Sequence, residues 1–129
     1  MRMIFVNLPV KDLDASKEFF GALGFAFNPQ FTDQDAACMI VDENIFVMLL
    51  TEDRFRDFIN GEIADATRAT ETITALSADS PEQVDELLSK AMAAGGKPWK
   101  PTMDEGFMYG SSFQDLDGHV WEMMYMEPQ

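Results

Sequence analysis

The same order of structural signals occurs twice along this chain, and the repeat constrains the fold more than any other feature. Residues 3–10 alternate in the manner of a half-buried strand, and a helix signal follows that begins at Asp12 or Asp14 and stops at Gly24. A second strand signal, over residues 71–78, also leads into a helix signal. Each helix signal is followed by β-rich segments. One such unit alone would leave an apolar sheet face bare, so we expect the two units to pair.

Local signals place the ends of these elements. Ser80 is the predicted N-cap of the second helix, Pro81 suits its first position, and Gln83 completes a capping box. Two turns interrupt the β-rich segments, one at residues 42–44 (Asp-Glu-Asn) and one at residues 117–118 (Asp-Gly). These turns predict hairpins in equivalent places of the two units.

Length and charge limit the domain count and the classes of partner. The 129 residues suit a single domain, and we divide it into module one at residues 1–51, a connector at 52–69 and module two at 70–129. There are 23 acidic and 9 basic side chains, which give a formal net charge of −14. Such a surface repels phosphate backbones and anionic lipids, so we expect no nucleic-acid partner and no membrane partner.

The sequence favours a cytoplasmic protein. Cys38 is the single cysteine, so no disulfide can form within the chain, and an inert buried thiol is expected. No apolar segment approaches the roughly 20 residues that span a bilayer. The first residues also lack the apolar segment and cleavage site of a signal peptide.

Two segments resemble the vicinal oxygen chelate superfamily, which includes glyoxalase I, bleomycin-resistance proteins, fosfomycin-resistance enzymes and extradiol dioxygenases. The opening motif of that superfamily is a strand, a capped helix and the residues Leu-Gly-Phe in that order, and in this chain it is similar to FVNLPVKDLDASKEFFGALGF. The closing motif is similar to FQDLDGHVWEMMY. The resemblance implies an α+β fold of two βαβββ modules, whose curled mixed sheets surround a cavity. It also implies a homodimer, and we expect the lactoylglutathione-lyase-like subgroup.

In metal-using members of that superfamily, two side chains from each module hold a divalent ion. The first lies seven residues before the aspartate that opens each helix, which gives Phe5 and Thr72 when Asp79 is taken as the second aspartate. The closing motif gives Glu122, and the matching segment of module one gives Met48. A phenyl ring has no donor atom, a thioether is a soft ligand, and one carboxylate alone binds a divalent ion poorly. We therefore expect no metal ligand and no cofactor, with zinc, nickel or manganese as the alternative.

Strand parity predicts an apolar, methionine-rich cavity lining with few polar groups. The same parity places Asn7 with Phe5 and Thr74 with Thr72, and a register shift of two residues would put Asn7 and Thr74 at the ligand positions instead. Tyr109 could contribute from a later strand. His119 lies three residues before Glu122, so on a strand these two side chains would point to opposite faces. The predicted ligand-binding residues are Phe5, Asn7, Met48, Thr72, Thr74, Tyr109 and Glu122.

Glu122 is the predicted catalytic residue if the protein is an enzyme, which the sequence leaves open. Its carboxylate could be held structurally, contact a ligand or exchange a proton, or ligate a metal ion. The first hypothesis is a protein that binds or sequesters a small ligand in an apolar pocket without a metal. The alternative is a metal-dependent lyase or isomerase of the lactoylglutathione lyase type with an altered site. A third hypothesis is an interaction module whose pocket has lost its ligand.

Overall fold

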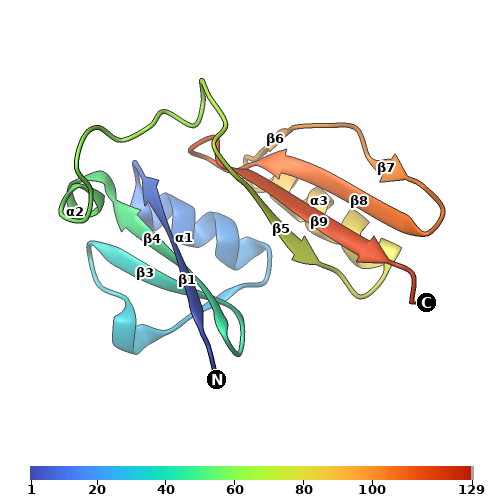
Figure 1. Ribbon diagram of the computed structural model, residues 1–129, viewed down its shortest axis with the longest axis horizontal. Coiled ribbons are helices and arrows are strands. Elements are labelled where there is room, and N and C mark those ends of the chain that lie inside the picture. Colours follow the sequence, from blue (N-terminus) through green and yellow to red (C-terminus); the bar gives the residue numbers. More distant parts are fainter. Residues whose placement is uncertain (129) are drawn as a thin grey trace. The chain divides into compact units, whose positions relative to one another are not determined.

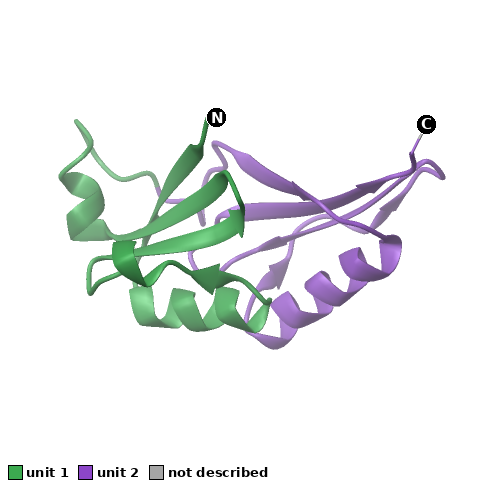
Figure 2. Cartoon of the chain, turned by 90° about the horizontal axis from the view of Figure 1, so that it is seen from below, with its two compact units in different colours: residues 1–64 green, residues 65–129 purple. Residues whose placement is uncertain are grey.

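The chain forms two compact units, which divide between Ala64 and Asp65 (Figure 2). The computed structural model describes residues 1–128. Each unit contains one mixed sheet and one long helix, so the predicted α+β fold class is confirmed. Both sheets are open and neither closes on itself.

Unit 1, residues 1–64, has a strand, a long helix and three further strands in that order (Figure 1). Its elements are β1 (Ile4–Val10), α1 (Leu13–Ala22), β2 (Ala26–Phe27), the 3-10 helix η1 (Pro29–Phe31), β3 (Ala36–Asp42), β4 (Ile45–Thr51) and α2 (Glu52–Arg56). The sheet order is β1-β4-β3-β2, and β1 runs parallel to β4 while the other pairs are antiparallel. Because β1 is an edge strand within this sheet, it can contain Pro9, which has no N–H to donate.

Unit 2, from residue 65 onward, repeats this plan. Its elements are β5 (Ile73–Ser77), α3 (Pro81–Ala93), β6 (Lys97–Pro98), β7 (Met103–Asp104), β8 (Met108–Gln114) and β9 (Val120–Met126). The sheet order is β5-β9-β8-β6, and β7 also pairs with β8. The first strand, β5, runs parallel to the last, β9, as β1 does to β4. The predicted β-α-β-β-β order is therefore present in both units, with one extra short strand in the second.

Side-chain caps begin both long helices where the sequence predicts. Asp12 accepts a hydrogen bond from the backbone N–H of Ala15 at 3.1 Å, and Ser80 accepts one from that of Gln83, also at 3.1 Å. The Gln83 side chain reaches back and accepts a hydrogen bond at 2.6 Å from the backbone N–H of Asp79, one residue before the cap, so the predicted capping box forms with Asp79 rather than Ser80 as the donor. The helices have 10, 5 and 13 residues. Within the described chain, no helix has the length and apolar character needed to cross a bilayer.

In each unit the long helix lies along one face of its own sheet (Figure 2). The buried side chains of β9 and β8 that meet α3 include Trp121, Met123 and Phe113, and Val84 and Ala91 of α3 are buried with them. Alternate residues of these strands point to the other side, which we call the face opposite α3. The corresponding side of the first sheet is the face opposite α1.

Candidate functional site

Glu122 lies near the middle of β9, which is an inner strand between β5 and β8. The register pairs it with Ala75 of β5 and with Ser112 of β8. Since paired residues share a face of a sheet, these three residues lie on the face opposite α3. Glu122 is half-buried, and within residues 1–128 its side chain has no hydrogen-bond or ion-pair partner. A carboxylate in this position is available to a ligand.

Small side chains surround this carboxylate across the sheet. Ala75 and Ser112 are its cross-strand neighbours, and one step further along β8 is Gly110, which pairs with Met124. A methyl group added at Gly110 would lie 2.6 Å from the Met124 sulfur, so the Met124 thioether already covers that position. The Ser112 hydroxyl accepts a hydrogen bond from the backbone N–H of Lys100 at 3.1 Å. The cross-strand neighbours of the carboxylate are therefore small side chains, and the apolar Met124 thioether lies beside it.

A buried aspartate holds the turn that leads into β9. One carboxylate oxygen of Asp115 accepts hydrogen bonds from the backbone N–H groups of Asp117 at 2.9 Å and His119 at 3.0 Å. The other accepts from the indole N–H of Trp121 at 3.0 Å. His119 lies in this turn, before β9 begins. The aspartate of the closing motif thus has a structural role, because it sets the start of the strand that carries Glu122.

Burial raises the pKa of Asp115 above its ordinary value, although the charge of His119, the Trp121 indole and the backbone donors act in the opposite direction. A carboxyl with a raised pKa in the folded state stabilises the fold fully below its unfolded pKa of about 3.9, and this contribution is lost as the pH rises through the folded value. We therefore expect the stability of the wild type relative to Asp115→Asn to fall as the pH rises from about 4 to neutral. Urea unfolding of both proteins across this range measures the difference, and a difference that is constant with pH would contradict the expectation.

Three of the predicted ligand-binding residues do not lie with Glu122. Thr74 pairs with Trp121, so it faces α3, and Thr72 precedes β5 with the same parity. The Tyr109 hydroxyl donates a hydrogen bond to Asp85 of α3 at 2.7 Å, so its ring also lies on the helix side, and this bond raises the pKa of Tyr109. Tyr109 therefore links β8 to α3 through this hydrogen bond.

The position of the helix cap explains the placement of the threonines. Asp12 caps α1, but Ser80 rather than Asp79 caps α3. Counting seven residues back from the two N-caps gives Phe5 and Ile73, whereas counting from Asp79 gives Thr72. A change of one residue reverses the face of a strand, and the register indeed brings Ile73 to the Glu122 side by pairing it with Val120.

The predicted residues of unit 1 do share one face. Phe5 pairs with Phe46, and their rings stack with centroids 4.9 Å apart. Asn7 pairs with Met48, and its side-chain amide donates to the Phe5 carbonyl at 3.2 Å. In the repeated register, the Asn7–Met48 pair of unit 1 corresponds to the Ala75–Glu122 pair of unit 2. By these registers Met48 is the counterpart of Glu122.

These residues do not fit a divalent ion held in the manner of the metal-using members. With the observed registers, the four equivalent positions are Phe5, Met48, Ile73 and Glu122. Of these only Glu122 offers oxygen donors, and the hard or borderline ions prefer oxygen and nitrogen ligands. Among residues 1–128, no three or more His, Cys, Asp or Glu side chains are grouped so that they could hold a metal.

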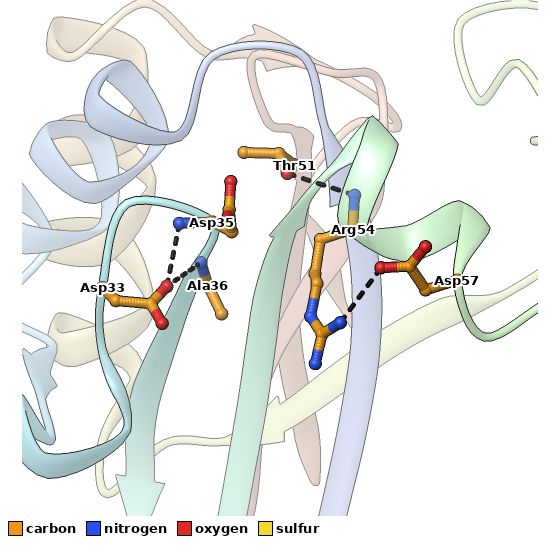
Figure 3. Close-up of polar contacts among 6 residues, drawn as sticks. All are labelled: Asp33, Asp35, Ala36, Thr51, Arg54 and Asp57. Carbon is orange, nitrogen blue, oxygen red and sulfur yellow. Dashed lines mark hydrogen bonds and ion pairs between the residues drawn. The ribbon is translucent and has the colours of Figure 1, made fainter.

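An acidic hollow in unit 1 is a second candidate, and sequence reasoning missed it (Figure 3). Its volume is about 350 Å³, and it is lined by Asp33, Asp35, Asp53, Arg54 and Asp57. Asp33 accepts hydrogen bonds from the backbone N–H groups of Asp35 at 2.8 Å and Ala36 at 3.0 Å. The Arg54 guanidinium pairs with Asp57 at 3.0 Å. These contacts order the loop before β3 and the end of α2, so the side chains already serve the local structure.

Comparisons with known proteins agree with this fold. A family model described as "Bleomycin resistance protein-like N-terminal" matches residues 2–42. No curated protein matches the chain. A hypothetical protein from S. aureus has a similar solved structure with a TM-score of 0.82 and 28% identity, over 97% of this chain and 94% of that one.

Two further solved structures carry family names. A glyoxalase/bleomycin resistance protein/dioxygenase family enzyme from Burkholderia phytofirmans has a TM-score of 0.80 and 16% identity, over 98% of this chain and 99% of that one. A genomically encoded fosfomycin resistance protein, FosX, from Listeria monocytogenes has a TM-score of 0.70 and 18% identity, over 97% and 93%. The chain therefore has the glyoxalase/bleomycin-resistance fold, and residues 2–42 are similar to a bleomycin-resistance-like model.

Proposed function

We propose that this protein binds a small molecule on the face opposite α3, around Glu122, without a bound metal ion. The observation that carries the proposal is the half-buried Glu122 carboxylate, which has no partner within residues 1–128 although it lies on an inner strand. Carboxylates that fold into apolar surroundings are normally paired, so an unpaired one favours contact with a ligand. Val120 and Met124 flank it along β9, and small-molecule sites typically combine such apolar side chains with a few polar groups.

The relatives support binding or sequestration as the role. The family model that matches the first module is named after bleomycin resistance, and one structural neighbour is a fosfomycin resistance protein. Removal of a toxic small molecule by binding requires a pocket but no catalytic group. The donor-poor positions Phe5, Met48 and Ile73 suit that role better than metal-assisted chemistry.

The alternative is a lyase or isomerase of the lactoylglutathione lyase type, with Glu122 as the general base. A free carboxylate within reach of a ligand could accept a proton, which favours this alternative. The missing ligands at the three equivalent positions weigh against it, because one carboxylate would hold zinc, nickel or manganese weakly.

A metal-removal experiment separates these functions. After treatment with EDTA we expect the melting temperature to be unchanged, and a set of apolar small molecules should still raise it by several degrees near 100 times Kd, where binding adds about 2.7 kcal/mol. Glu122→Gln should reduce that rise, whereas Glu82→Gln, which removes the same charge from exposed α3, should not. Stoichiometric zinc, nickel or manganese together with an isomerase activity lost in Glu122→Gln would instead establish the lyase alternative. No response to metals or small molecules would favour the interaction module.

We also propose that the protein works in the cytoplasm as a homodimer, as its composition and its resemblance to the superfamily suggest. Light scattering after size-exclusion chromatography tests the dimer, and a monomer at micromolar concentration would contradict it.

A further inference from the structure

The surroundings of Glu122 point to the chemical class of the ligand, and we infer that this face recognises an organic cation, an amine carried on an apolar body. This inference rests on the proposed function, because it concerns the same site. A metal cation does not fit the donors present, as shown above, so the charge that would complement Glu122 must be carried by an organic group.

No basic side chain within residues 1–128 forms an ion pair with this carboxylate. Within residues 1–128 Glu122 has no ion pair, and its cross-strand neighbours Ala75 and Ser112 carry no charge. Lys90 is paired with Glu86 on α3 at 2.8 Å, which is on the other side of the sheet. The charge at Glu122 is therefore open to compensation by a bound ammonium group, and such a charge-assisted hydrogen bond is stronger than one from a neutral donor.

The charge of the whole protein acts in the same direction. A formal net charge of −14 raises the local concentration of cations and lowers that of anions. An anionic ligand would have to approach both this field and the unpaired Glu122. A neutral ligand would gain only the weaker hydrogen bond.

The side chains next to Glu122 suit an apolar body attached to the amine. Val120 and Met124 lie two residues before and after it on the same face, and the Met124 thioether packs over Gly110. Ala75 and Ser112 are small, and Glu122 itself is only half-buried, so part of its side chain is exposed to a ligand. Thioethers adapt to irregular shapes, so the apolar part of the ligand can vary.

Three ligands that differ only in the charged end test the inference. The probes are 3-phenylpropylamine, 3-phenylpropanol and 3-phenylpropanoate, titrated at neutral pH and physiological salt into protein labelled with ¹³C at the methionine methyl groups. We expect the Met124 methyl signal to shift with all binding events and the ammonium form to bind at least tenfold more tightly than the alcohol, a difference of about 1.4 kcal/mol. The carboxylate should bind most weakly.

Matched variants complete the experiment. Glu122→Gln should bring the ratio between amine and alcohol close to one, and Glu82→Gln on α3 should leave it unchanged. If the alcohol binds wild type as tightly as the amine, or if both variants lower the ratio equally, the inference is wrong while small-molecule binding stands. If none of the three probes moves the Met124 signal at millimolar concentration, the proposed function itself is wrong and the inference is rejected with it.

Discussion

Replacing Trp121 by alanine is expected to lower the free energy of unfolding by about 3–5 kcal/mol, the cost of removing a large buried aromatic side chain. Trp121 is 1% exposed and lies on the side of β9 that meets α3. Its loss would open a cavity beneath the helix. It would also remove the hydrogen bond that the indole N–H donates to the buried Asp115 carboxylate, with 3.0 Å between nitrogen and oxygen. Both effects are expected to destabilise unit 2.

The chain contains a matched control, because Trp99 is its other tryptophan and is 37% exposed. Trp99→Ala should cost less than about 1 kcal/mol, as is usual away from the core. Trp121→Phe keeps most of the buried volume but lacks the N–H donor, so it should cost about 1–3 kcal/mol and remain folded if the alanine variant does not. Urea unfolding followed by far-UV circular dichroism measures all three. Equal losses for the two alanine variants would show that Trp121 does not anchor the core.

Gly118→Ala is expected to destabilise the protein by about 2–4 kcal/mol, through a strained backbone and a collision together. Gly118 has φ of +88°, in the region that favours glycine. A methyl group there would lie 2.9 Å from the backbone nitrogen of Thr67 and 3.0 Å from the carbonyl group of Ala66. Neither backbone atom can move away as a flexible side chain could. The turn before β9 is therefore packed directly on the segment that leads toward β5.

Gly106 separates the two causes, because its φ of +83° is similar but a methyl group there would meet no atom within 4 Å. Gly106→Ala should thus show the backbone strain alone, about 1–2 kcal/mol. The excess loss in Gly118→Ala measures the close approach to Ala66 and Thr67. If thermal or urea unfolding gives the same loss for both variants, the contact contributes nothing to stability.

The parts of the fold that sequence reasoning predicted correctly depend on neighbours a few positions apart. Asp12 was one of two aspartates that could cap the first helix, and Ser80 was predicted as the cap of the second. The turn at residues 42–44 connects β3 to β4, and the turn that contains residues 117–118 connects β8 to β9. Caps and turns form from hydrogen bonds and backbone preferences within one short segment, so the local sequence is sufficient to place them.

Predictions that needed more than one element were less accurate. The strand expected over residues 71–78 spans only Ile73–Ser77. The acidic hollow is lined both by the loop that contains Asp33 and by residues around α2, later in unit 1. No single stretch of sequence therefore indicates it.

The amino-acid sequence by itself determined the repeated β-α-β-β-β order and the helix starts, because alternation, caps and turn residues act locally. Only the tertiary structure decided which residues accompany Glu122. Pairing between β5 and β9 brings Ala75 and Ile73 to its face and turns Thr74 toward α3. Strand faces alternate with every residue, so a single position in a long-range register decides whether a side chain lies on the Glu122 face or against the helix.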